Sequence, residues 1–114
     1  MTKSKVVLVP FPFDDLSITK VRPASCLTDP IGTYRHLVLA FITSTIPADL
    51  METDFVIDST HADFRMTGLR ASSTLRLHRL MTVTASLIER ELGSISSDVQ
   101  NKVDEKLRKL FKLA

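Results

Sequence analysis

The sequence predicts an α+β fold in which an antiparallel sheet is followed by a C-terminal helix. Several short stretches with β character come first, an amphipathic stretch with helical spacing comes last, and no helices alternate with the strands. With 114 residues, 44% of them hydrophobic, the chain is long enough for one compact core and too short for two ordinary domains. We therefore expect a single domain that spans residues 1–114.

The first expected strand is the continuous apolar run of residues 6–9, which is typical of a strand buried on both faces. Pro10 and Pro12 are expected to end this strand, because each proline lacks a backbone donor and has a fixed φ. The rings of Phe11 and Phe13 would then lie at its rim.

A loop of residues 12–21, which contains Asp, Ser and Thr side chains that favour local turns, should lead to the second strand. Arg22 and Pro23 mark the approach to that strand, and residues 25–28 have clear β character. Arg22 itself is expected to lie in the loop. The segment of residues 29–32, Asp-Pro-Ile-Gly, then predicts a turn.

The most apolar run of the chain, residues 36–43, is the predicted central strand. It ends in three hydroxyl residues, Thr43, Ser44 and Thr45. Such residues are either turn and capping residues or part of a site, and composition alone favours a turn.

Two more strands are predicted, at residues 55–58 and 73–81. In the second of these, alternation turns two leucines inward and turns Arg76 and His78 outward, so this strand can present positive charge to a ligand. Between the strands, residues 58–63 combine carboxylates with His61, but the ligands are too few for a metal site, and a polar loop explains the composition.

Two helices are predicted near the C-terminus. A short helix should run from an N-cap at Thr84 to about Leu92, with Gly93 as a left-handed C-cap. A second helix should begin near Ser96 and continue to the end of the chain. The apolar face of the second helix consists of Val99, Val103, Leu107, Leu110 and Phe111. The ion pairs expected along its exposed side are Asp98–Lys102, Asp104–Arg108 and Glu105–Lys109.

Composition narrows the function only weakly. The formal net charge of +2 does not identify a nucleic-acid binder, and the four arginines within residues 63–79 fit a phosphate-facing surface and a solvated strand face equally well. Cys26 is the only cysteine, so we expect a small buried residue in a reducing compartment. No apolar run approaches the length of a membrane span, and we expect a cytoplasmic protein without membrane contact.

The pattern VVLVPFPF-DDLS-x-x-K-x-RP in residues 6–23, followed later by an apolar strand that ends in Ile-Thr-Ser, resembles the PemK/MazF family of toxin endoribonucleases from type II toxin–antitoxin systems. The likeness covers nearly the whole chain, including the segment TGLRASSTLRLHRLMTV and the C-terminal helix. One departure is visible: many members begin the first strand with Gly-Asp, whereas this chain has Ser4 and Lys5.

The resemblance implies a small SH3-like β-barrel with a C-terminal helix, of the PemK/CcdB type, found as a homodimer. It also implies a sequence-selective endoribonuclease, an mRNA interferase that acts on single-stranded RNA without a metal ion or cofactor and is neutralised by a cognate antitoxin protein. The expected reaction is attack by the ribose 2′-OH on the adjacent phosphate, which gives a 2′,3′-cyclic phosphate and a free 5′-OH.

The residues that match the catalytic pair of the family are Arg22, in the Arg-Pro motif, and Thr43, in the Ile-Thr-Ser motif. Arg22 would stabilise the phosphorane, and the hydroxyl of Thr43 would donate to a non-bridging oxygen or position the 2′-OH. Phe13 is either a base-stacking residue or a core residue. The candidate RNA-binding residues are Phe13, Lys20, Ser44, Arg70, Ser73 and Arg76.

Two other functions remain open for this sequence. A toxin of the same fold can bind a protein target such as DNA gyrase without cutting RNA, and a degenerate member would keep only antitoxin binding. The Arg22 and Thr43 pair favours the nuclease, while the departure at Ser4 and Lys5 is compatible with a degenerate member.

Overall fold

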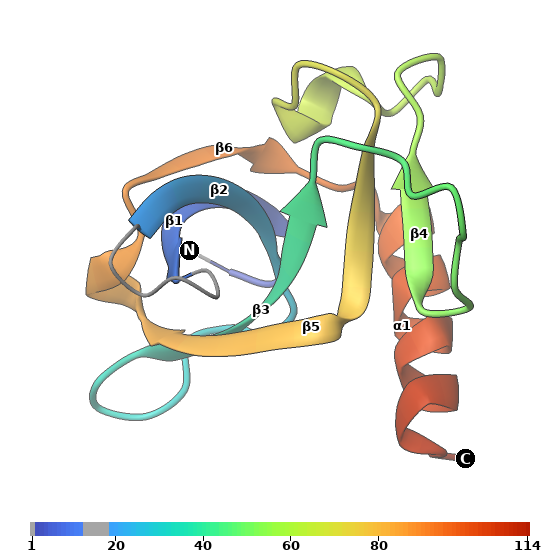
Figure 1. The fold of residues 1–114 in the computed structure, drawn as a ribbon. Helices are drawn as coiled ribbons and strands as arrows, with labels where there is room; N and C mark the ends of the chain where they lie inside the picture. Colours follow the sequence, from blue (N-terminus) through green and yellow to red (C-terminus); the bar gives the residue numbers. More distant parts are fainter. Residues whose placement is uncertain (1, 13–18) are drawn as a thin grey trace.

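The computed structural model describes residues 2–12 and 19–114, which form one six-stranded sheet and a C-terminal helix. The sheet curls into a half-open barrel, and the helix packs along one side of it (Figure 1). Neighbouring strands are antiparallel throughout, in the order β4-β5-β3-β2-β1-β6, so the predicted fold class is confirmed. The strands are β1 (Lys5–Pro12), β2 (Thr19–Cys26), β3 (His36–Thr43), β4 (Asp54–Ile57), β5 (Ser73–Thr84) and β6 (Arg90–Ser94). The helical elements are α1 (Ser97–Phe111) and the 3₁₀ turns η1 (Arg65–Thr67) and η2 (Ala85–Leu87).

The core consists of two apolar clusters, one on each face of the central strands. On β1, Val6 packs in the cluster that contains the buried face of α1, whereas Val7 and Val9 pack in the other cluster. This double burial explains why the first strand is a continuous apolar run. The predicted central strand has the expected bounds, His36–Thr43, and pairs with β2 on one side and β5 on the other.

The two prolines do not end β1, contrary to prediction. β1 continues to Pro12 and pairs with β2 over its whole length, but β6 covers only Lys5 to Leu8 on the other edge. Among the described residues, no strand pairs with the outer edge of β1 at Pro10 and Pro12, and such an unpaired edge tolerates proline. Phe11 is buried rather than at the rim, with its ring edge-on to Phe41 at a centroid distance of 5.0 Å. Phe13 lies outside the described residues.

The second strand begins at Thr19, earlier than predicted, because the ladder with β1 extends to that residue. Arg22 is consequently part of β2, opposite Val9, and does not lie in a loop. The predicted turn also shifts along the chain: Ile31 and His36 form an isolated bridge, and Gly32 supplies the positive φ of 75° within the turn.

The predicted helix of residues 84–92 is wrong. Only the single turn η2 forms, and β6 follows it because pairing with β1 overrides the local helical pattern. Gly93 is therefore not a C-cap. A Cβ atom at Gly93 would meet the carbonyl oxygen of Met66, and a Cβ atom at Gly68, whose φ is 73°, would meet that of Leu92. The two glycines thus let η1 pack directly against β6.

The C-terminal helix begins as predicted, with the Ser96 hydroxyl accepting the amide N–H of Val99 at 3.2 Å. Val99 and Val103 are buried, whereas Phe111 at the last turn is 55% exposed. Of the three expected i,i+4 ion pairs, the structure contains Asp98–Lys102; the other cations pair elsewhere, Lys109 with Glu52 and Arg108 with Glu105 one turn back. No helix in the described part of the chain is long and apolar enough to cross a membrane.

Candidate active site

Arg22 and Thr43, the predicted catalytic pair, line the same pocket. Arg22 comes from β2 and Thr43 is the last residue of the neighbouring strand β3. The pocket has a volume of about 310 Å³. We call it the Arg22–Thr43 pocket, and its lining residues are Arg22, Pro23, Phe41, Ile42, Thr43, Ser44, Thr45 and Arg79.

The hydroxyl of Thr43 belongs to a hydrogen-bonded turn at the end of β3. Its Oγ1 lies 3.1 Å from Oγ1 of Thr45 and accepts the Thr45 amide at 3.4 Å. Across the ladder, Thr74 donates its hydroxyl to the Thr45 carbonyl at 3.0 Å, which fixes the turn to β5. These hydroxyl residues can therefore both form a turn and belong to a site, since the turn holds Thr43 at the pocket.

A bulge in β5 brings a second arginine to this pocket. Ala40 pairs with Leu80 and the next residue of β3, Phe41, pairs with Arg76, so residues 77–79 of β5 have no partner on β3. β5 bends sharply at this corner (Figure 1). The guanidinium of Arg79 lies over the ring of Phe41, 4.8 Å from its centroid, in a cation–π contact.

The Arg22–Thr43 pocket shares lining residues with two other depressions. It shares Pro23 and Ser44 with a second pocket, which we call the Arg70–Arg90 pocket, and it shares Arg79 with a third one. We refer to the three together as the basic groove. Within residues 2–12 and 19–114, no acidic side chain lines it. The residues that line the Arg70–Arg90 pocket are Leu8, Pro23, Ser44, Gly68, Leu69, Arg70, Ala71, Ser73, Arg90 and Leu92. The third depression is lined by Phe11, His78, Arg79, Leu80 and Met81.

The predicted RNA-binding residues separate into those inside and those outside the groove. Ser44, Arg70 and Ser73 line the Arg70–Arg90 pocket. Lys20 is exposed on β2, opposite Phe11, and lines none of the three depressions. The groove therefore contains three of the five predicted RNA-binding residues that the structure describes, and Lys20 and Arg76 lie outside it.

Arg76 lies outside the groove and is already paired. Its Nε donates to Oδ1 of Asp54 at 3.0 Å, and the Asp54 side chain is completely buried. Asp54 also accepts the amide of Met51 at 2.9 Å, so this carboxylate joins β4, β5 and the preceding loop. The alternation of the strand predicted an outward Arg76 but gave no sign of the buried carboxylate beside it.

Arg79 and Arg90 line the groove but were not among the predicted site residues. Arg79 was counted in the arginine-rich segment of residues 63–79, yet regular alternation assigned it to the same face as Leu75 and Leu77; the unforeseen bulge moves it to the groove. Arg90 fell within the predicted helix of residues 84–92, and only the strand assignment places it beside Leu8.

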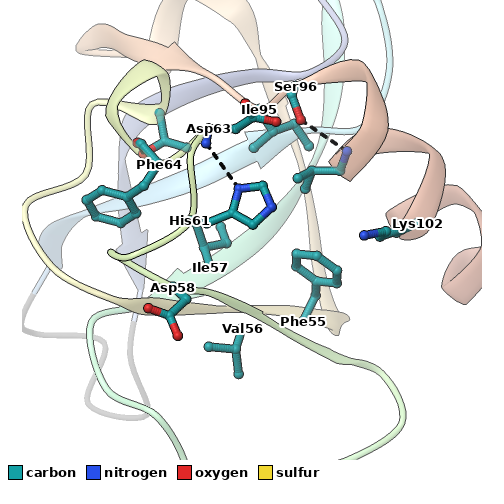
Figure 2. Close-up of a pocket in the computed structure, with 12 residues that line it drawn as sticks. Phe55, Val56, Ile57, Asp58, His61, Asp63, Phe64, Ile95, Ser96 and Lys102 are labelled. Atoms are coloured by element: carbon teal, nitrogen blue, oxygen red, sulfur yellow. Dashed lines mark hydrogen bonds between the residues drawn. The ribbon is translucent and has the colours of Figure 1, made fainter.

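A separate pocket lies between β4, the loop of residues 58–64 and the start of α1 (Figure 2). His61 lies among its lining residues, and its Nδ1 accepts the amide of Asp63 at 3.1 Å (Figure 2). Hydrogen bonds from Thr60 hold the pKa of Asp58 below its ordinary value. These contacts are local turns of a polar loop. In the described residues, no three His, Cys, Asp or Glu side chains gather as a metal-ligand set.

Cys26 is completely buried in β2, and burial raises the pKa of its thiol to about 11. The thiol is therefore protonated at neutral pH and is a poor nucleophile. This agrees with the expectation of a small buried residue.

The chain matches the model of a known protein family over residues 2–111, described as the PemK-like, MazF-like toxin of type II toxin–antitoxin systems. No curated protein sequence matched it. Among solved structures, it is similar to an endoribonuclease from a mycobacterial species in complex with its cognate antitoxin, with a TM-score of 0.72, 13% identity, and coverage of 100% of this chain and 97% of the other. It is also similar to the Mycobacterium tuberculosis toxin MazF-mt6, with a TM-score of 0.68, 20% identity, and coverage of 95% and 98%. A further mycobacterial endoribonuclease gives a TM-score of 0.70 at 15% identity, over 99% and 92% of the two chains. At these identities the structural matches establish the fold alone.

Proposed function

Since this chain belongs to the PemK-like, MazF-like toxin family of type II toxin–antitoxin systems, we propose that it is a toxin that cuts single-stranded RNA at preferred sequences without a metal ion or cofactor. The observation that carries the proposal is the shared pocket of Arg22 and Thr43, on neighbouring strands and inside a groove with further arginines. A groove of this kind suits the phosphate backbone of a single strand.

In the proposed reaction, the ribose 2′-OH attacks the adjacent phosphorus and the 5′-oxygen of the next nucleotide leaves. A bond between the 2′-oxygen and phosphorus forms as the bond between phosphorus and the 5′-oxygen breaks. The 2′-OH loses one proton and the 5′-oxygen gains one, which leaves a 2′,3′-cyclic phosphate and a 5′-OH. Negative charge grows on the non-bridging oxygens, and Arg22 stabilises it because its guanidinium can donate two N–H groups to one phosphate.

Thr43 supplies a hydroxyl that the turn at the end of β3 already orients. Its contact with Thr45 limits rotation of the side chain, so little ordering is needed when RNA binds. Arg79 adds a second positive charge, and its stacking on Phe41 limits the motion of the guanidinium.

The proposal includes a homodimer. It also includes a cognate antitoxin, because one similar mycobacterial endoribonuclease was solved in complex with its own antitoxin. The arginines of the groove would attract an acidic antitoxin segment as well as RNA, so inhibition by direct competition is the expected mode.

The test is incubation of purified, antitoxin-free protein with a long RNA in EDTA, followed by mapping of the new 5′ ends. Wild-type protein should produce discrete cuts. Thr43→Val, which removes the hydroxyl and keeps the shape, should reduce the rate by about 100- to 1,000-fold. Arg22→Lys keeps the positive charge but cannot donate two parallel N–H groups to one phosphate, so its cleavage rate should also be strongly reduced.

Arg65→Ala provides the matched control, because Arg65 is exposed on η1 and lines no part of the groove. Its cutting should equal that of wild type. If folded wild-type protein cuts no RNA, the nuclease proposal fails, and binding of a protein target such as DNA gyrase becomes the better explanation.

A further inference from the structure

Resting on the proposed nuclease function, we propose that the Arg70–Arg90 pocket binds the base of a nucleotide next to the scissile phosphate and selects guanine or uracil over adenine or cytosine. Its position supports this role. The pocket shares Pro23 and Ser44 with the Arg22–Thr43 pocket, and these residues directly follow Arg22 and Thr43 in the chain. A nucleotide whose phosphate contacts Arg22 can therefore place its base there.

The walls of this pocket suit the flat faces of a base. Leu8, Leu69 and Leu92 provide apolar contact surface, and the volume is about 260 Å³. One side of the pocket follows η1 and the other side belongs to β6. The close backbone approach at Gly68 and Gly93 packs η1 against β6 and so limits changes in the width of the pocket. A site for phosphate alone would not need these leucines.

The polar groups of the pocket define which base edge it accepts. Arg70 and Arg90 can only donate hydrogen bonds, and neither makes an ion pair or side-chain hydrogen bond in the part of the chain that the structure describes. Ser73 donates its hydroxyl hydrogen to the carbonyl of Ala71 at 2.9 Å, so its oxygen can only accept a further bond. The pocket thus offers arginine donors together with a serine acceptor.

Guanine and uracil match this arrangement because each presents a carbonyl oxygen beside a ring N–H. Adenine and cytosine present an amino group beside an unprotonated ring nitrogen, which is the reverse pattern. An arginine that binds the carbonyl would meet a donor instead in the wrong base, and a well-formed arginine–base contact discriminates by about tenfold.

The first experiment is cleavage of an RNA pool randomised around the cut, with sequencing of both product ends. Wild-type protein should cut about tenfold more often where one flanking base is guanine or uracil. Arg90→Gln and Arg70→Gln should each reduce this preference while still cutting, and Arg65→Gln should leave it unchanged. Equal cutting with all four bases, or an unchanged preference in both pocket variants, would overturn the proposal.

The second experiment does not depend on cleavage. Isotope-labelled protein is titrated with GMP, UMP, AMP, CMP and inorganic phosphate, and the amide shifts of Leu69 and Leu92 are followed by NMR. GMP and UMP should shift these signals at lower concentrations than AMP and CMP. Inorganic phosphate alone should not shift them. Equal responses to all four nucleotides, or a full response to phosphate, would contradict base selection even if the protein cuts no RNA.

Discussion

The basic groove and the surface around α1 are both rich in cationic side chains, but the two regions use them in opposite ways. Around α1, four cations form ion pairs with carboxylates: Lys3 with Asp104, Lys102 with Asp98, Arg108 with Glu105 and Lys109 with Glu52. In the groove, Arg70, Arg79 and Arg90 have no carboxylate partner among the described residues. The formal charge of +2 for the whole chain therefore understates the positive potential of the groove.

The same contrast appears within one strand. Arg76 and Arg79 are three residues apart on β5, yet Arg76 binds the buried carboxylate of Asp54 and Arg79 lies over Phe41 at the groove. Arg76 is the last residue paired with β3 before the bulge, and Arg79 belongs to the bulge of residues 77–79. Arg76 is thus expected to stabilise the fold and Arg79 to bind ligand, and substitutions can test this division of roles.

The largest effect on stability is expected for Arg76→Ala. It leaves the Asp54 carboxylate buried without its cation, which should lower the free energy of unfolding by about 3 kcal/mol or more in urea denaturation. Lys109→Ala is the control, because its exposed pair with Glu52 should contribute less than about 1 kcal/mol. A loss for Arg76→Ala no larger than that of the control would contradict a structural role.

The next effect concerns Cys26, which lies in the core cluster that does not contain the buried face of α1. Since the unfolded Cys26 thiol loses its proton near pH 9.0 and the folded thiol only near 11, the folded state binds more protons between these values, and stability falls as the pH rises. The loss should reach about 2 to 3 kcal/mol near pH 11. Urea denaturation of wild type and Cys26→Ala, at about pH 8 and about pH 10.5, isolates this contribution from the lysines, which titrate in both proteins. An equal decrease in the free energy of unfolding of the two proteins would exclude a contribution from Cys26.

Arg79→Ala should show the opposite behaviour to Arg76→Ala. Its free energy of unfolding should fall by no more than about 1 kcal/mol, the usual contribution of an exposed cation–π contact, while affinity for a non-cleavable, 2′-deoxy-substituted RNA should fall by about tenfold. The slope of log affinity against log salt should decrease by about 0.7, as expected for one lost phosphate contact on a single strand. Fluorescence anisotropy at several salt concentrations measures both quantities. If affinity is unchanged, Arg79 is not part of the ligand site.

The smallest effect on stability is expected for Ser25→Ala, since Ser25 belongs neither to the basic groove nor to the surface around α1. Ser25 is completely buried in β2, and its hydroxyl has no hydrogen-bond partner in the structure as described. Ser25→Ala should therefore change the free energy of unfolding by less than about 0.5 kcal/mol or increase it slightly, because no hydrogen bond is lost. A thermal denaturation curve well below that of wild type would show that the hydroxyl has a partner.

Sequence patterns predicted the parts of the fold in which local preference and tertiary packing agree. The apolar run of β3 and the start of the C-terminal helix near Ser96 were both predicted correctly, because each local pattern agrees with the packing. The segment after Thr84 has a helical pattern, but strand pairing with β1 decides its structure. A single sequence contains no direct signal for a pairing partner so distant in the chain.

Only those residues of the candidate site that belong to sequence motifs could be predicted. The Arg-Pro and Ile-Thr-Ser motifs identified Arg22 and Thr43, which the fold brings to one pocket. Arg79 could not be assigned, since alternation holds only while a strand stays in register, and the bulge after Arg76 breaks that register. The pairing of Arg76 with Asp54 also depends on a contact between residues far apart in sequence.

The corner of β5 gives this fold a place where the length of the chain can vary. Residues 77–79 have no partner on β3, and the ladders on either side of them are complete without them. Leu77 is buried in the core and its amide donates to the carbonyl of Thr53, whereas His78 and Arg79 are exposed. An insertion or deletion at His78 and Arg79 would therefore leave both ladders in register while changing which side chains reach the groove. The side chains that face the groove can therefore vary without any change to the strand pairing that holds Arg22 and Thr43.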